Sequence, residues 1–102
     1  MMQILLCCAA GMSTSMLVSK MQDVARERGL EVILRAIPVA DFERSFEEAD
    51  VILLGPQVQY EAARLSAIAA PQGKAVAVID MMDYGMMRAE QVLDKALALY
   101  PV

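Results

Sequence analysis

A thiol stands at the end of an apolar run near the start of the chain, directly ahead of small and hydroxyl-bearing residues. The stretch reads LLCCAAGMSTS over residues 5–15, with Cys7 and Cys8 adjacent. If a strand ends near Cys8 and a helix begins near Ser13, a tight loop lies between them. Its backbone amides can turn inward around an anion, and Gly11 allows a positive φ angle there. The pattern predicts a phosphate-sized anion site with a cysteine nucleophile at its centre.

Of the two thiols, Cys8 is the predicted nucleophile. Successive side chains of a strand point to opposite faces, so Cys7 is expected in the core while Cys8 opens onto the loop. The chain has no histidine, so it offers no imidazole base and no Cys–His pair. A cysteine at a strand end is also common as a plain core residue. The local pattern therefore leaves open a non-catalytic domain that binds an anion, or a redox domain that uses Cys7 and Cys8.

The loop resembles that of small tyrosine phosphatases, in which a cysteine is followed six residues later by an arginine. Thr14 occupies that position in this chain. Without a bidentate arginine, the loop is expected to hydrolyse phosphate esters poorly. A relative of the low-molecular-weight phosphatases or arsenate reductases is the alternative, and the missing arginine counts against it. A phosphorylated thiol that waits for another acceptor behaves as a carrier.

Apolar runs and helical spacing predict a regular alternation of strands and helices. Strands are expected over 2–8, 31–37, 50–55 and 74–80, and helices over 13–28, 41–49, 56–70 and 86–100. Ser13 is expected to cap the first helix and Gly29 to end it. Such alternation indicates an α/β three-layer sandwich, with a parallel four-stranded sheet covered by helices on both faces. Right-handed crossovers favour the strand order 2-1-3-4, and the fold would resemble that of low-molecular-weight tyrosine phosphatases.

In that strand order, the chain reverses direction beside the first strand, where ligands of open α/β sheets gather. Cys8 ends the first strand, Gln57 follows the third, and Asp80 and Tyr84 follow the fourth. We expect these residues to converge on one rim. Gln57 suits donation to phosphate or to a partner, or a place at a helix start. Asp80 suits a cap, a turn or proton handling, and Tyr84 suits the rim or a packed turn.

The composition of the chain indicates which classes of partner and ligand are not expected. The chain has 102 residues, 58% of them hydrophobic, and a formal net charge of −4. Nucleic acid is not expected as a partner, because phosphate contacts need clustered lysine and arginine. No apolar run approaches the roughly 18 residues of a membrane span, so direct membrane insertion is not expected. No metal or cofactor is expected either, and two adjacent cysteines fit a reduced, cytoplasmic thiol better than a disulfide.

Three blocks of the sequence carry a family resemblance. CAAGMSTSMLVSKM (8–21), ADVILLGPQVQY (49–60) and VIDMMDYGMM (78–87) resemble the IIB components of the bacterial phosphoenolpyruvate-dependent sugar phosphotransferase system, lactose/cellobiose type. The resemblance implies a single IIB domain over residues 1–102, with the four-stranded parallel sheet described above. The combination of AGMSTS, LLGPQ and DYG is specific, whereas any one of them alone would be weak.

The resemblance also implies a function. Such a protein takes a phosphoryl group from a phosphohistidine of the IIA component and holds it on a cysteine, which matches Cys8 here. It then passes the group to cellobiose, chitobiose, lactose or a similar sugar that the membrane component IIC brings in. Two departures are the thiol of Cys7, where many members have an aromatic residue, and Ala9, where many have serine or threonine. The implied phosphate loop consists of Ala9, Ala10, Gly11, Met12, Ser13, Thr14 and Ser15.

Overall fold

A parallel sheet forms the centre of the molecule. The computed structural model describes residues 2–9 and 12–100, and describes residues 12 and 13 in their backbone alone. The sheet has four strands in the order β2-β1-β3-β4, as the sequence predicts, and every neighbouring pair is parallel. The strands are β1 (Met2–Cys8), β2 (Val32–Pro38), β3 (Val51–Leu54) and β4 (Ala75–Val78).

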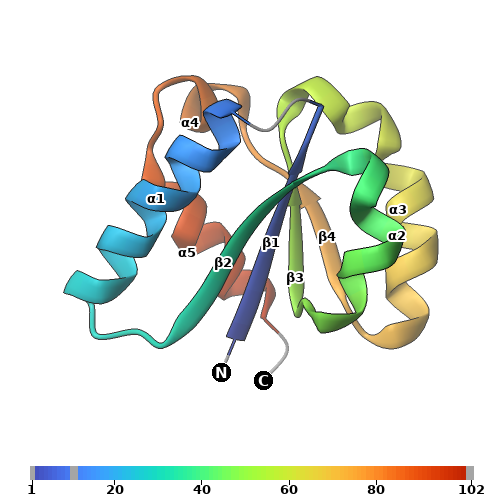
Figure 1. Cartoon of the computed structure of the whole chain (residues 1–102), viewed down its shortest axis with the longest axis horizontal. Helices are drawn as coiled ribbons and strands as arrows, with labels where there is room; N and C mark the ends of the chain where they lie inside the picture. The colour runs from blue at the N-terminus through green and yellow to red at the C-terminus, as the bar shows by residue number, and fades with distance from the viewer. Residues whose placement is uncertain (1, 10–11, 101–102) are drawn as a thin grey trace.

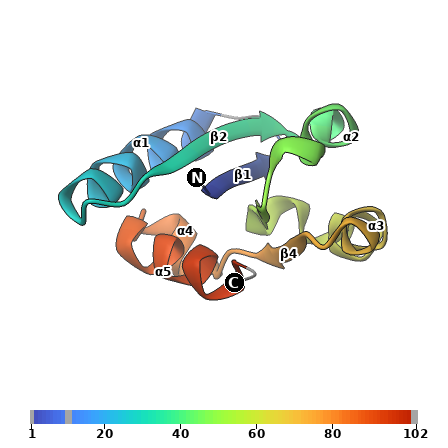
Figure 2. The same ribbon diagram turned by 90° about the horizontal axis from the view of Figure 1, so that it is seen from below.

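Helices cover both faces of this sheet (Figure 1 and Figure 2). The α-helices are α1 (Met12–Glu27), α2 (Phe42–Ser45), α3 (Ala62–Ala69), α4 (Met81–Gly85) and α5 (Ala89–Leu99). In both views α1, α4 and α5 lie on one side of the strands, and α2 and α3 lie on the other. The three-layer α/β sandwich expected from the sequence is therefore confirmed.

Each face of the sheet buries its own apolar cluster, and successive side chains of β1 point alternately into the two clusters. Ile4 and Leu6 pack with residues of α1 and α5, whereas Leu5 and Cys7 pack with residues of α2 and α3. All four side chains are buried. This alternation confirms the prediction that Cys7 belongs to the core.

The ends of α1 differ in how well the sequence predicts them. The helix begins at Met12, so Ser13 lies in its first turn and the prediction of Ser13 as the cap is wrong. The predicted end at Gly29 is confirmed. Gly29 has a φ angle of +69°, and the amides of Gly29 and Leu30 donate to the carbonyls of Arg26 and Ala25. This is the left-handed terminus that glycine adopts without strain.

Three helical predictions need correction. The helix expected over 41–49 consists of α2 between two 3₁₀ turns, Val39–Asp41 and Phe46–Glu48. The helix expected from Pro56 starts as a 3₁₀ segment, Pro56–Glu61, and becomes α3 only afterwards, because the buried Val58 takes non-helical angles. The helix expected over 86–100 is α5 alone, and the short α4 precedes it.

Candidate active site

Two adjacent, buried cysteines lie at the carboxyl end of β1. Cys8 is the last residue of the strand and Cys7 the one before it. Cys8 is 2% exposed and Cys7 is fully buried, and both are thiols rather than disulfide partners. Burial raises the pKa of the Cys7 thiol from its ordinary 9.0 to about 12, and the neighbouring Cys8 adds to the effect. Cys7 therefore stays protonated and unreactive at neutral pH.

Backbone hydrogen bonds align the strand ends around Cys8. The amide of Gly55, directly after β3, donates to the carbonyl of Cys7 over 2.9 Å. The amide of Ile79, directly after β4, donates to the carbonyl of Leu54 over 2.8 Å. The segments that follow β1, β3 and β4 consequently leave the sheet from one edge, as the sequence analysis expects.

The predicted phosphate loop is described only in part. Ala10 and Gly11 lie outside the described residues, as do the side chains of Met12 and Ser13. Ala9 directly follows the strand and is exposed, and Ser15 is an exposed residue of α1. The loop therefore runs from the end of β1 into the first turn of α1, where backbone amides and the helix dipole favour an anion.

Thr14 is the clearest feature of this loop. Its exposed fraction is zero. Among the side chains that the structure describes, Thr14 is the polar residue that is fully buried. Its hydroxyl lies 3.0 Å from the hydroxyl of Tyr84 in α4. The position that carries arginine in the phosphatases is thus filled by a short side chain sealed beneath Tyr84.

The rim residues named from the sequence come together around Tyr84. The side-chain nitrogen of Gln57 donates to the Tyr84 hydroxyl over 3.0 Å. Asp80 caps α4, because its carboxylate accepts hydrogen bonds from the amides of Met82 and Asp83 over 2.9 and 3.1 Å. Both hydrogen bonds of Asp80 go to backbone amides, so its observed contacts are those of a helix cap.

A surface hollow of about 340 Å³ lies beside these residues, lined by Pro56, Gln57, Met81, Tyr84 and Gly85. The neighbouring methionines are exposed, with 70% of Met81 and 58% of Met82 accessible to solvent. Helix α4, which builds one wall of the hollow, was missed by the sequence analysis. The sequence analysis named Asp80 as a possible cap, and that signal, two residues after β4, indicates a helix start such as that of α4.

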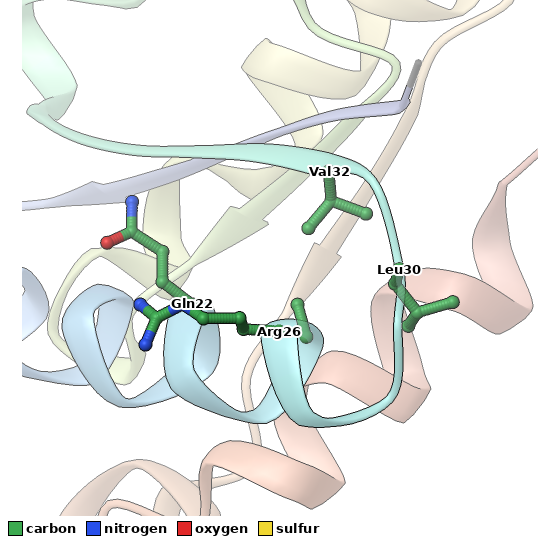
Figure 3. Close-up of a pocket in the computed structure, with 5 residues that line it drawn as sticks. Gln22, Arg26, Leu30 and Val32 are labelled. Atoms are coloured by element: carbon green, nitrogen blue, oxygen red, sulfur yellow. The ribbon is translucent and has the colours of Figure 1, made fainter.

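A second hollow lies at the opposite end of α1, where the chain turns into β2 (Figure 3). It encloses about 290 Å³ and is lined by Gln22, Ala25, Arg26, Leu30 and Val32. Arg26 is paired with Asp23 at 3.1 Å. Because this hollow lies at the amino end of β2, it is separated from Cys8 by the length of the strands.

The described part of the chain has neither a metal-binding cluster nor a helix suited to a bilayer. Within residues 2–9 and 12–100, no cluster of three or more histidine, cysteine, aspartate or glutamate side chains is placed to hold a metal ion. In the same residues, no helix combines the length and apolar character needed to cross a bilayer.

Comparison with known proteins identifies the family. Residues 3–95 match the family model described as the lactose/cellobiose-specific IIB subunit of the phosphotransferase system. The chain belongs to this IIB family. Its members are phosphotransferases that deliver phosphoryl groups to sugars, and the family implies IIA and IIC partners. The phosphatase alternative is not favoured.

Relatives of this IIB protein are similar over nearly their whole length. The galactose-specific EIIB component of Lactococcus lactis subsp. cremoris is 45% identical, over 91% of both chains. The oligo-beta-mannoside-specific EIIB component of Bacillus subtilis is 38% identical, over 97% of this chain and 96% of the relative. The solution structure of the cellobiose-specific IIB component of Borrelia burgdorferi superposes with a TM-score of 0.80 and 37% identity, covering 97% of this chain and 91% of that one.

Proposed function

We propose that Cys8 of this IIB protein carries the phosphoryl group between a IIA protein and a sugar. The observation that supports this most directly is the place of Cys8, which ends β1 immediately before the loop that leads into α1. In this proposal the backbone amides of the loop and the N-terminus of α1 stabilise the charge of the phosphoryl group in transit. We further propose that residues 1–102 form one IIB domain and that it works in the cytoplasm.

The proposed transfer has two steps. In the first, the Cys8 thiolate attacks phosphorus, a sulfur–phosphorus bond forms, and the nitrogen–phosphorus bond to the histidine of IIA breaks. In the second, a sugar hydroxyl brought by IIC attacks the same phosphorus. An oxygen–phosphorus bond forms, the sulfur–phosphorus bond breaks, Cys8 leaves as the thiolate, and the hydroxyl proton passes to solvent. Residues 9–15 hold the phosphoryl oxygens, and Thr14 in place of arginine fits a site that holds the group for the acceptor. The sugar is proposed only as a class, cellobiose, chitobiose, lactose or a similar saccharide.

The proposal is tested by intact mass after incubation with a phosphorylated IIA protein at neutral pH. We expect the mass of one phosphate on the unchanged chain and on Cys7→Ser, and none on Cys8→Ser. Cys7→Ser is the matched control, because it removes the adjacent thiol and leaves Cys8 in place. Equal loss in both variants, or phosphate that persists on Cys8→Ser, would contradict the assignment.

A further inference from the structure

The hydroxyl of Tyr84 joins three segments that are far apart in the sequence. It contacts the Thr14 hydroxyl in α1 and accepts a hydrogen bond from the Gln57 side chain, both at 3.0 Å. Thr14 follows β1, Gln57 follows β3, and Tyr84 itself follows β4. One phenolic oxygen therefore links the three chain segments that leave the sheet beside Cys8.

The contact with Thr14 fixes the first turn of α1. A hydroxyl with no solvent exposure needs a protein partner, and losing that partner leaves a buried polar group unsatisfied. Thr14 is the third residue of α1, so it belongs to the first turn of the helix, which is also the second half of the predicted phosphate loop. Any shift of this turn relative to α4 breaks the contact with Tyr84.

Gln57 fixes the phenol from the other side, and Gly55 allows it to do so. Gln57 is exposed, yet its side-chain amide folds back over the end of β3. The side-chain oxygen lies so close to Gly55 that a Cβ atom at position 55 would overlap it. From there its nitrogen donates to the Tyr84 oxygen. The Tyr84 oxygen therefore lies between the Gln57 nitrogen and the Thr14 hydroxyl, and either hydroxyl can donate in the contact between Thr14 and Tyr84.

We propose that Tyr84 is a positioning residue for phosphoryl transfer, which acts by holding the first turn of α1 through Thr14. This role rests on the proposed function of Cys8. Charge stabilisation by backbone amides depends on their placement, and displacements of about 1 Å can reduce a rate about 100-fold. Tyr84 thus contributes through loop geometry and needs no contact with either partner protein.

The test is Tyr84→Phe, which removes a single oxygen and keeps the ring. We expect the maximal rate of transfer from a phosphorylated IIA protein to fall about tenfold, the equivalent of one hydrogen bond lost. The donor concentration at half-maximal rate should change less than twofold. Tyr100→Phe is the matched control, because Tyr100 packs against the same core cluster, and its rate should equal that of the unchanged chain.

A second measurement separates this role from the proposed function. Tyr84→Phe should speed amide hydrogen exchange at residues 16–19 about tenfold, because the helical hydrogen bonds of these amides go to the carbonyls of the first turn of α1. This should hold whether or not phosphoryl transfer occurs. If Tyr84→Phe does not fold, Gln57→Leu takes its place, since this exposed side chain orients the same phenol.

Three results would overturn the role of Tyr84. They are a normal rate with normal exchange in Tyr84→Phe, an equal loss of rate in Tyr100→Phe, or a raised half-saturation concentration with an unchanged maximal rate. The last would place Tyr84 on the docking surface. Absence of transfer to the unchanged chain would instead overturn the proposed function, and the exchange measurement would then decide on Tyr84 alone.

Discussion

Replacing Cys7 with alanine removes a buried thiol whose protonation is linked to folding. Burial raises the Cys7 pKa from 9.0 to about 12 in the folded protein. In the unfolded chain the same thiol is solvated and releases its proton near its ordinary value. Between pH 9 and pH 12 the Cys7 thiol is deprotonated in the unfolded chain but protonated in the folded protein. Raising the pH in this range therefore lowers the free energy of unfolding. Stability from this group is complete below about pH 9 and is lost progressively as the pH rises to about 12.

The size of the effect follows from these two pKa values. At pH 10 the Cys7 thiol lowers the free energy of unfolding by about 1.4 kcal/mol relative to pH 7, and above pH 12 the loss approaches about 4 kcal/mol. For small proteins the free energy of unfolding falls by about 1–3 kcal/mol per molar urea. The loss of about 1.4 kcal/mol at pH 10 therefore corresponds to a fall of roughly 0.5–1.4 M in the urea concentration at the unfolding midpoint.

The assay is urea unfolding at pH 7 and pH 10 under reducing conditions. The informative quantity is the loss of unfolding free energy from pH 7 to pH 10 in the unchanged chain minus the same loss in Cys7→Ala, because this difference isolates the contribution of Cys7. We expect this difference to be about 1.4 kcal/mol. Val58→Ala is the matched control, because it opens a cavity in the same buried cluster without removing a titratable group. It should lose as much stability with pH as the unchanged chain.

Equal pH-dependent losses in the unchanged chain and Cys7→Ala would refute the reasoning. So would rapid alkylation of Cys7 at pH 8 in the folded Cys8→Ser variant, since a protonated and fully buried thiol should resist the reagent.

Three further substitutions test other parts of the structure by urea unfolding. Asp80→Ala removes the cap of α4 and should cost about 0.5–2 kcal/mol, whereas Asp80→Asn should keep most of the stability; equal costs would contradict the capping role. Leu53→Ala, in the fully buried β3, should cost about 2–5 kcal/mol, and a cost below about 1 kcal/mol would mean that the site is less tightly packed than described. Gly29→Ala should cost about 1–2 kcal/mol through its positive φ angle alone, because a Cβ there meets no atom within 4 Å; an unchanged midpoint would show that this helix end relaxes.

The sheet could be predicted because its strands are short, apolar and separated by helical spacing. A strand buried on both faces is expected to be apolar, and this holds for all of β3 and for β1 apart from Gln3, which is only partly buried. Right-handed crossovers then allow few strand orders, so alternation along the chain was enough to obtain the observed order. The place of Cys8 at a strand end follows from the same pattern.

Helix boundaries were harder because local and tertiary preferences compete there. Pro56 suits a helix start, but the burial of Val58 forces non-helical angles and a 3₁₀ segment until Glu61. The five-residue helix α4 is too short for apolar periodicity to reveal, and it depends on the Asp80 cap.

The sequence by itself determined the fold class, the strand order, the cysteine that ends β1 and, through its motifs, the IIB family. Each of these depends on residues close together in the chain or on rules of chain direction. Only the tertiary structure decided that the buried Thr14 hydroxyl contacts the Tyr84 hydroxyl and that the Gln57 side chain donates a hydrogen bond to the same Tyr84 oxygen. Thr14 and Tyr84 are 70 residues apart, and no local pattern encodes which of many hydroxyl groups a folded sheet brings within 3.0 Å of another.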